Sequence, residues 1–200
     1  MLVRDVMTAP RAVLSAETPV RRAARLFVER GAAAAPVLDE HGALLGIVTE
    51  IDLLREGYEP DPRASALPVT EPASALPERV ADVMSPDVVT TAENADVARL
   101  VDLMVRDRLR WVPVVRDARV VGMVGRGDLL RFHCRPDTDV AADLRAALEA
   151  GAPYTEPVSA EVHDGVAHLA REGATPEQRR TAANIARTVP GVSRVVYDEP

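Results

Sequence analysis

A chain of 200 residues has room for two compact domains, because single hydrophobic cores are commonly built from about 100 to 150 residues. Hydrophobic residues make up 47% of the sequence and aromatic residues only 3%, so we expect a core filled by Ala, Val and Leu. The formal net charge of -7, with no block of basic residues, argues against nucleic acid as the main partner.

The compartment is indicated by the cysteine content and by the N-terminus. Cys134 is the only cysteine, which excludes an intrachain disulfide and favours a reducing environment. The opening MLVRDVMTAP has Arg and Asp where a signal peptide needs an apolar stretch, and no run approaches the roughly 18 apolar residues of a membrane span. We therefore expect a cytoplasmic protein.

The strongest pattern in the sequence is an internal repeat. VRDVM at residues 3–7 returns as VADVM at residues 80–84, an offset of 77 residues. At the same offset Pro36-Val37 matches Pro113-Val114, and after one deletion GIVTEIDLLR matches GMVGRGDLLR. Agreement over whole units indicates duplication rather than chance.

Each repeat predicts the same elements in chain order. An extended lead-in precedes an amphipathic helix, two short strands joined by a polar turn follow, and a second helix begins near Asp52 or Asp128. The strands are expected at residues 36–38 and 44–48 in the first copy, and at 112–115 and 120–124 in the second. The apolar positions of the first helices are expected to face a core: Val20, Ala23, Ala24, Phe27 and Val28, and Val97, Leu100, Val101, Met104 and Val105.

The segment at residues 58–78 separates the two copies. With the residues just before it, this stretch holds five prolines and two ASALP sequences, which disfavour a continuous helix or a central strand. We interpret it as a linker or surface arm.

The repeated D-V-M, the Pro-Val after the helix and the closing G-h-h-T-x-x-D, where h is apolar, together resemble a tandem pair of cystathionine-β-synthase (CBS) domains. The resemblance covers residues 1–57 and 79–135. It implies an α+β fold in which two β-α-β-β-α repeats pack sheet to sheet as one module. Such a module commonly forms a homodimer and binds adenosine-containing ligands between its repeats.

Thr49 and Asp52 of the closing motif have two interpretations. A helix that starts near Thr49 offers backbone N–H groups and a hydroxyl to a phosphate, and the Asp52 carboxylate can accept hydrogen bonds from both ribose hydroxyls. The same two side chains also fit a capping box, in which they only satisfy the N–H groups of the helix start. The two roles share their geometry, and the repeat favours ligand contact.

The second copy departs from this motif, because Gly125 replaces the hydroxyl residue while Asp128 is retained. Glycine is acceptable at a helix N-cap, so the resemblance leaves the phosphate contact of this copy open. The residues before the mid-unit proline usually line the base pocket in this family, and Arg110 lies where relatives often carry a phosphate-contacting basic residue. Trp111 either stacks on a purine or packs in a core or dimer interface. The resemblance thus implies these further ligand-binding residues: Ala34, Ala35, Arg110, Trp111 and Val112.

Residues 136–200 predict a separate small domain of order α-β-β-α-β. A helix precedes a hairpin with an Asp164-Gly165 turn, and Thr175-Pro176-Glu177-Gln178 opens another helix before a last strand. With its closing P-G-V-x-x-V, this pattern resembles a BON domain, a module proposed to contact phospholipid. Relatives usually have Ser-Gly after the hairpin leucine, where this chain has Ala170-Arg171-Glu172. We therefore expect an intramolecular or protein-binding role ahead of membrane contact.

No pattern for catalysis or metal binding emerges. His163 and His168, five residues apart, are expected to face opposite sides of a strand, and His133-Cys134 is interpreted as helix-end packing. The sequence contains no P-loop, no G-x-G-x-x-G, no G-x-S-x-G and no zinc-binding spacing.

The favoured hypothesis is a non-catalytic bacterial regulatory protein with no obligatory cofactor. Its CBS pair senses AMP, ADP, ATP or S-adenosylmethionine and signals through a change in the homodimer or in the BON-like domain, or to a protein partner. The alternative is a ligand-free dimeric scaffold that presents BON-like modules to a protein or phospholipid.

Overall fold

The computed structural model describes residues 1–55, 77–151 and 158–198, apart from the side chain of Arg55. The expected linker at residues 58–78 lies almost wholly outside the described residues. The chain divides into two compact units, and each unit takes residues from both repeats. One consists of Met1–Met7, Asn94–Arg110 and Val124–Pro200, and the other of Thr8–Glu93 and Trp111–Met123.

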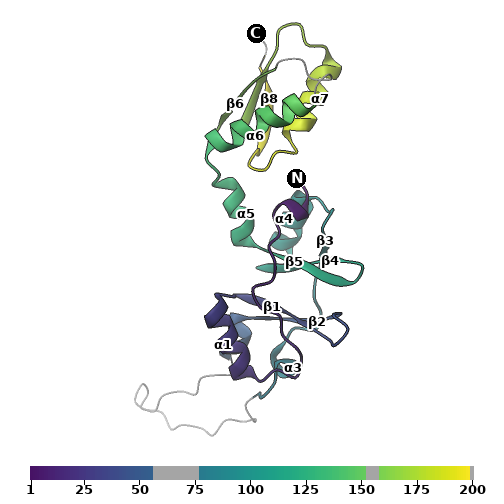
Figure 1. The fold of residues 1–200 in the computed structure, drawn as a ribbon, viewed down its shortest axis with the longest axis vertical. Coiled ribbons are helices and arrows are strands. Elements are labelled where there is room, and N and C mark those ends of the chain that lie inside the picture. Colours follow the sequence, from purple (N-terminus) through teal and green to yellow (C-terminus); the bar gives the residue numbers. More distant parts are fainter. Residues whose placement is uncertain (56–76, 152–157, 199–200) are drawn as a thin grey trace, which may run out of the picture. The chain divides into compact units, whose positions relative to one another are not determined.

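The helices and strands of the first repeat follow the predicted order (Figure 1). A 3-10 turn, η1 (Val3–Asp5), precedes α1 (Val20–Arg30), β1 (Ala34–Leu38), β2 (Leu44–Thr49) and α2 (Glu50–Arg55). β1 and β2 form an antiparallel pair, while the lead-in makes only a single parallel bridge from Leu14 to Val37. The buried cluster of this repeat includes Phe27, Val37 and Val48.

The second repeat has the same order with a longer lead-in strand. Its elements are α3 (Val80–Val83), β3 (Thr91–Ala92), α4 (Val97–Arg106), β4 (Trp111–Arg116), β5 (Arg119–Gly125) and α5 (Arg126–His133). These strands form one sheet of order β3-β4-β5, in which β3 and β4 are parallel. The bridge from Thr91 to Val114 is the equivalent of the one from Leu14 to Val37 at the offset of 77 residues. The predicted α+β class and β-α-β-β-α order are therefore confirmed, with the first lead-in reduced to one bridge.

The opening segment of each repeat is hydrogen-bonded to the other repeat. The Val3 N–H donates to the Ala95 carbonyl at 2.9 Å, and the equivalent Val80 N–H donates to the Thr18 carbonyl at 2.9 Å. In the same way Thr8 and Ser85, which lie outside any strand, form isolated antiparallel bridges to Met123 and Ile47. Each D-V-M segment therefore belongs structurally to the opposite copy, so neither repeat is a self-contained fold.

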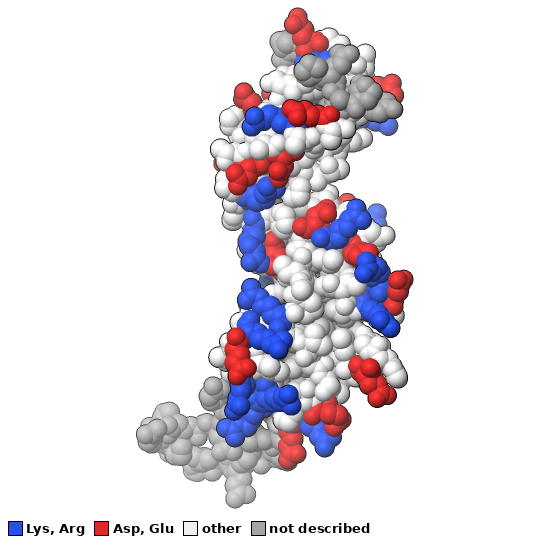
Figure 2. Space-filling view, viewed as in Figure 1, with Lys and Arg blue, Asp and Glu red and all other residues white. Residues whose placement is uncertain are grey.

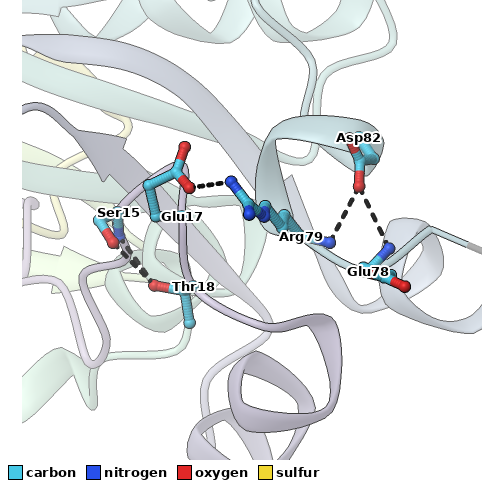
Figure 3. A network of polar contacts seen from close by, with 6 residues as sticks. All are labelled: Ser15, Glu17, Thr18, Glu78, Arg79 and Asp82. Carbon is cyan, nitrogen blue, oxygen red and sulfur yellow. Dashed lines mark hydrogen bonds and ion pairs between the residues drawn. The ribbon is translucent and has the colours of Figure 1, made fainter.

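Figure 3 shows the junction between residues 15–18 and 78–82. The Thr18 hydroxyl oxygen accepts from the Ser15 N–H at 3.2 Å, and the Arg79 guanidinium donates to the Glu17 carboxylate. One carboxylate oxygen of Asp82 accepts from the Arg79 N–H at 2.9 Å, as in an N-terminal helix cap. These contacts hold the start of α3 against the residues that lead into α1.

Three residues of the predicted apolar stripes do not face a core. Val28 in α1 is 85% exposed and the equivalent Val105 in α4 is 71% exposed, whereas Phe27 and Met104 are buried. Val101 in α4 is also exposed, at 38%. The prediction was wrong for these positions because the buried arc of each helix is narrower than the apolar arc of its sequence.

A two-residue turn between β4 and β5 places Asp117 and Ala118 at positive φ, 50° and 63°. This turn geometry requires the left-handed conformation, which costs a residue with a side chain roughly 1–2 kcal/mol. We expect Ala118→Gly to raise the free energy of unfolding by about 1 kcal/mol, since glycine removes this strain at some cost in entropy. Urea unfolding measures the change. Ala142→Gly is the control: Ala142 is exposed on a helix spanning residues 137–150, where glycine should lower the free energy of unfolding by about 1 kcal/mol. Loss of stability in both variants would contradict the argument that Ala118 is strained in the turn.

Gly46 in β2 is required by a close approach of the chain. A Cβ at this position would lie 2.7 Å from the Met84 Sδ and 3.0 Å from the Ser85 carbonyl oxygen. Gly46→Val is therefore expected to lower the free energy of unfolding by about 1–3 kcal/mol through overpacking. A Cβ added at Gly127 in α5 would meet no atom within 4 Å. Gly127→Ala should therefore leave the free energy of unfolding unchanged or raise it. Equal effects of the two substitutions in a denaturation series would count against this interpretation.

The C-terminal elements have the predicted order α-β-β-α-β. They are α6 (Asp137–Ala150), β6 (Ser159–His163), β7 (Val166–Ala170), α7 (Pro176–Ala186) and β8 (Arg194–Tyr197). β7 is the central strand, antiparallel to β6 and parallel to β8, and both helices pack on the sheet. The predicted cap of α7 is present, with the Thr175 N–H donating to the Gln178 side chain at 2.9 Å. The core of this domain comprises Val140, Leu144, Leu148, Val162, Ala167, Leu169, Ala182, Ala186 and Val189.

Candidate functional site

In the first repeat the candidate site lies where β2 passes directly into α2. Thr49 is the last residue of β2, and Asp52 is the third residue of α2. One carboxylate oxygen of Asp52, Oδ2, accepts from the Thr49 N–H at 2.8 Å and from the Thr49 hydroxyl at 2.7 Å. The capping geometry anticipated for this motif is therefore present.

The capping contacts use one oxygen of the Asp52 carboxylate. Both of its hydrogen bonds to Thr49 use Oδ2, and within the described part of the chain Oδ1 accepts none. The Asp52 side chain is only partly buried, so it reaches the surface of the repeat. The Thr49 hydroxyl proton points at Asp52, and it must turn before it can be donated to a phosphate.

The second repeat has the same framework, but its carboxylate, that of Asp128, is more deeply buried than that of Asp52. The Gly125 N–H donates to Asp128 Oδ2 at 2.8 Å, as Thr49 does in the first copy. The Arg131 guanidinium donates to the other oxygen, Oδ1, and the Asp128 side chain is only 4% exposed. Both carboxylate oxygens are thus occupied by the protein itself.

The ion pair between Arg131 and Asp128 was not anticipated from the sequence. The two residues are three apart on a helix, which is a spacing at which side chains meet, so the signal was present. The exclusion of solvent from Asp128 was not visible from spacing, because it depends on the packing of the whole repeat.

The residues expected to line a base pocket lie beside these helix starts. The Glu50 N–H donates to the Ala33 carbonyl at 3.2 Å, and the equivalent Arg126 N–H donates to the Arg110 carbonyl at 3.1 Å. In each repeat, the residue just before the first of the two paired strands is therefore hydrogen-bonded to the first residue of the second helix. Of the predicted residues Ala34, Ala35 and Val112 are buried, Trp111 is half-buried and Arg110 is exposed.

Comparison with known proteins identifies the two repeats. The CBS domain model matches residues 3–59 and 80–140, which is more than half of the chain. The chain belongs to the CBS-domain family. A BON domain model matches residues 136–199, so the tandem CBS pair is followed by a BON domain.

Relatives of the CBS pair are found among curated proteins and solved structures. The uncharacterized protein YlbB of Bacillus subtilis is 31% identical over 128 residues, covering 64% of this chain and 78% of YlbB. The CBS pair of protein MJ0100, solved with 5′-methylthioadenosine and S-adenosyl-L-methionine, has 26% identity and a TM-score of 0.53 over 66% of this chain and 94% of that one. CBSX2 of Arabidopsis thaliana, solved with AMP, has 27% identity and a TM-score of 0.53 over 65% of this chain and 93% of its own.

The BON domain brings its two histidines together, contrary to expectation. The His163 and His168 rings have their centroids 5.8 Å apart, because the two-residue turn pairs His163 with Val166 and leaves His168 on the same sheet face. His168 Nδ1 also lies 3.2 Å from an Asp198 carboxylate oxygen. Among the described residues, no group of three or more His, Cys, Asp or Glu side chains is arranged to hold a metal ion.

Cys134 follows α5 of the CBS pair and is exposed, so the interpretation of His133-Cys134 as helix-end packing was wrong for the thiol. α5 ends one residue earlier, and its last turn is open to solvent. In the part of the chain that the structure describes, no helix is both long and apolar enough to span a bilayer.

Proposed function

We propose that this chain is a non-catalytic regulatory protein whose CBS pair senses an adenosine-containing ligand. AMP, ADP, ATP and S-adenosylmethionine are the candidate ligands, none as an obligatory cofactor. Ligand binding changes the packing of the CBS pair and is passed on through a homodimer, through the BON domain or to a protein partner. Its single cysteine fits a reducing compartment such as the cytoplasm.

The observation that carries this proposal is the Asp52 carboxylate at the junction of β2 and α2, held in place by Thr49 and only partly buried. Its Oδ2 is held by Thr49, which fixes the orientation of the side chain, and the carboxylate is the group that would accept a hydrogen bond from a ribose hydroxyl. The CBS pairs of MJ0100 and CBSX2, which were solved with adenosine-containing ligands, support this ligand class. Ala34 and Ala35, at the adjoining start of β1, would leave space for the base.

The second site is proposed to be the weaker one. The residues proposed to contact a ligand there are Arg110, Trp111, Val112, Gly125 and Asp128. Because Asp128 is buried and already bonded to Arg131, a ribose would have to displace this ion pair. Occupancy of one ligand per chain at low concentration is therefore expected.

Homodimer formation is supported by apolar residues that both repeats expose. In the first repeat Val28 and Leu54 are exposed on α1 and α2, and in the second repeat the equivalent Val105 and Leu130 are exposed on α4 and α5. Apolar side chains at equivalent exposed positions are the pattern of a surface that is covered by a partner.

A thermal-shift panel of AMP, ADP, ATP and S-adenosylmethionine tests the proposed function. At about 100 times its dissociation constant, a ligand of the folded state should stabilise it by about 2.7 kcal/mol. A flat response to all four compounds would overturn the sensor proposal.

The second candidate function is a ligand-free dimeric scaffold that presents BON domains to a protein or phospholipid. The observation in its favour is the sheet face that carries Glu161, His163 and Arg194, which are all exposed. A flat thermal-shift panel together with a stable dimer and co-sedimentation with anionic vesicles would favour this function. No sedimentation with vesicles would leave only a protein as the partner of the scaffold.

A further inference from the structure

The second repeat is connected to the BON domain by a very short segment. α5 ends at His133 and α6 begins at Asp137, within one compact unit of the chain. Three residues lie between the two helices: Cys134, Arg135 and Pro136. Three residues span at most about 10 Å, and the ring of a proline fixes its φ angle. The start of the BON domain therefore follows any movement of the end of α5.

Arg135 joins this connection to the loop that precedes β8. Its guanidinium donates to the Pro190 carbonyl at 2.5 Å and to the Asp143 carboxylate at 2.6 Å, and its side chain is only 25% exposed. Figure 2 shows basic and acidic side chains next to each other over the part of the surface where α5 and α6 lie. Gly191, at a φ of 101°, allows the loop to come close, since a Cβ there would lie 2.6 Å from a Val140 methyl carbon. These contacts hold the loop against the start of α6.

Asp137 joins the same connection to the hairpin of the BON sheet. Its two carboxylate oxygens accept from the Asp164 N–H at 2.7 Å and from the Gly165 N–H at 3.0 Å. Asp164 and Gly165 form the turn between β6 and β7, and both have positive φ. A movement of residues 134–137 therefore reaches two loops of the BON sheet, the hairpin turn and the loop before β8.

The start of α5 carries the proposed second ligand site. Asp128 is the third residue of α5, and its buried carboxylate accepts from the Gly125 N–H and from the Arg131 guanidinium. Arg131 lies about one turn further along the same helix and is 66% exposed. A ligand hydroxyl that bonds to Asp128 must therefore displace an arginine that belongs to α5 itself.

α5 is short enough to move as one body. Its eight residues make a helix about 12 Å long, so its start and its end move together. The half-buried side chains of Leu129 and Phe132 line a small cavity with Val101 of α4 and Val192 of the loop before β8. A close-packed contact would resist a shift of α5, whereas a cavity leaves space for one.

We propose that α5 couples the second ligand site to the BON domain, with the ion pair of Asp128 and Arg131 as an autoinhibitory contact and Arg135 as the positioning residue. The inference rests on the proposed sensing function and adds the route by which the BON domain responds. In the free protein Arg131 occupies the carboxylate. A ligand that takes its place moves the start of α5, and the end of the helix carries residues 134–137 with it. Because part of the binding energy is spent on opening the ion pair, the BON domain responds at ligand concentrations above those that fill the first site.

Opening of the ion pair without any ligand tests this coupling in the full chain. Arg131→Gln removes the guanidinium, and Asp128→Asn breaks the ion pair while it keeps a capping side chain and leaves no buried charge unpaired. Each variant should move the Gly165 amide resonance in nitrogen–proton correlation spectra. Arg99→Gln, which removes an exposed charge from α4 of the same unit, is the control and should leave this resonance in place. A Gly165 resonance that neither ion-pair variant moves would overturn the coupling.

Substitution of Arg135 tests its role as the positioning residue. In an Arg135→Ala background, Arg131→Gln should no longer move the Gly165 resonance, because the end of α5 is no longer joined to the loop before β8. Arg135→Lys keeps the charge but does not make both contacts, so it should behave in the same way. An equal shift of Gly165 with and without Arg135 would overturn this role.

Titration with AMP, ADP, ATP and S-adenosylmethionine in turn separates failure of the coupling from failure of the sensing function. A saturating ligand should move the Gly165 resonance of the wild type. In Arg135→Ala the same ligand should bind with an unchanged dissociation constant and leave Gly165 in place. A compound that binds the wild type at saturation without moving Gly165 overturns the coupling and leaves the sensor standing. Binding of none of the four overturns the sensing function, and the ion-pair variants then decide the coupling alone.

Discussion

Asp52→Ala is expected to remove most of the stabilisation that an adenosine-containing ligand gives the wild-type protein. A hydrogen bond between a ribose hydroxyl and a carboxylate contributes about 1.5–3 kcal/mol, so binding should weaken by roughly tenfold to a hundredfold. At a ligand concentration that stabilises the wild type by about 2.7 kcal/mol, the variant should then gain less than about 1.4 kcal/mol. Thermal unfolding with and without ligand measures both values.

Asp82→Ala is the matched control for this substitution. Asp82 accepts backbone hydrogen bonds at the start of α3, as Asp52 does at the start of α2, but it lies outside the candidate site. Both substitutions should lower the stability of the free protein by about 1 kcal/mol through loss of a helix cap. Only Asp52→Ala should reduce the effect of ligand. Equal ligand effects in the two variants would mean that Asp52 is a cap and nothing more.

Leu144→Ala is expected to destabilise the BON domain by about 2–5 kcal/mol. Leu144 is fully buried at the centre of the C-terminal core, and truncation leaves a cavity that the small neighbouring residues do not fill. The core of the first CBS repeat, around Phe27 and Val37, shares no residue with this cluster. The thermal shift produced by ligand should therefore stay at its wild-type value.

Phe27→Ala provides the reverse comparison. It removes the largest side chain from the core of the first CBS repeat and should cost about 3–5 kcal/mol. Calorimetry should show the two substitutions lowering different unfolding transitions. A single transition that moves equally in both variants would contradict the separation of the cores.

Much of the fold could be predicted from local sequence. The offset of 77 residues correctly paired the elements of the two copies, and Thr175 with Gln178 correctly marked the start of α7, because capping depends on residues close together in the chain. The Asp164-Gly165 turn was predictable for the same reason. Each of these features is decided within a few residues.

Features decided by distant contacts could not be predicted. The exchange of the D-V-M segments joins Val3 to Ala95 and Val80 to Thr18, and no local pattern encodes such pairings. The exposure of Val28 and Val105 depends on which neighbours cover each helix. In the candidate site, the sequence located Asp52 and Asp128 but could not show that Asp52 is partly buried while Asp128 is almost wholly buried.

Equilibrium dialysis of AMP and S-adenosylmethionine against the full chain, with the 2′,3′-dideoxy analogue of AMP in parallel, tests the account most directly. The account predicts that at least one of the two natural compounds binds at one site per chain, and that removal of the ribose hydroxyls from a binding nucleotide weakens it by tenfold or more. Binding of neither compound, or equal binding of AMP and its dideoxy analogue, would contradict it.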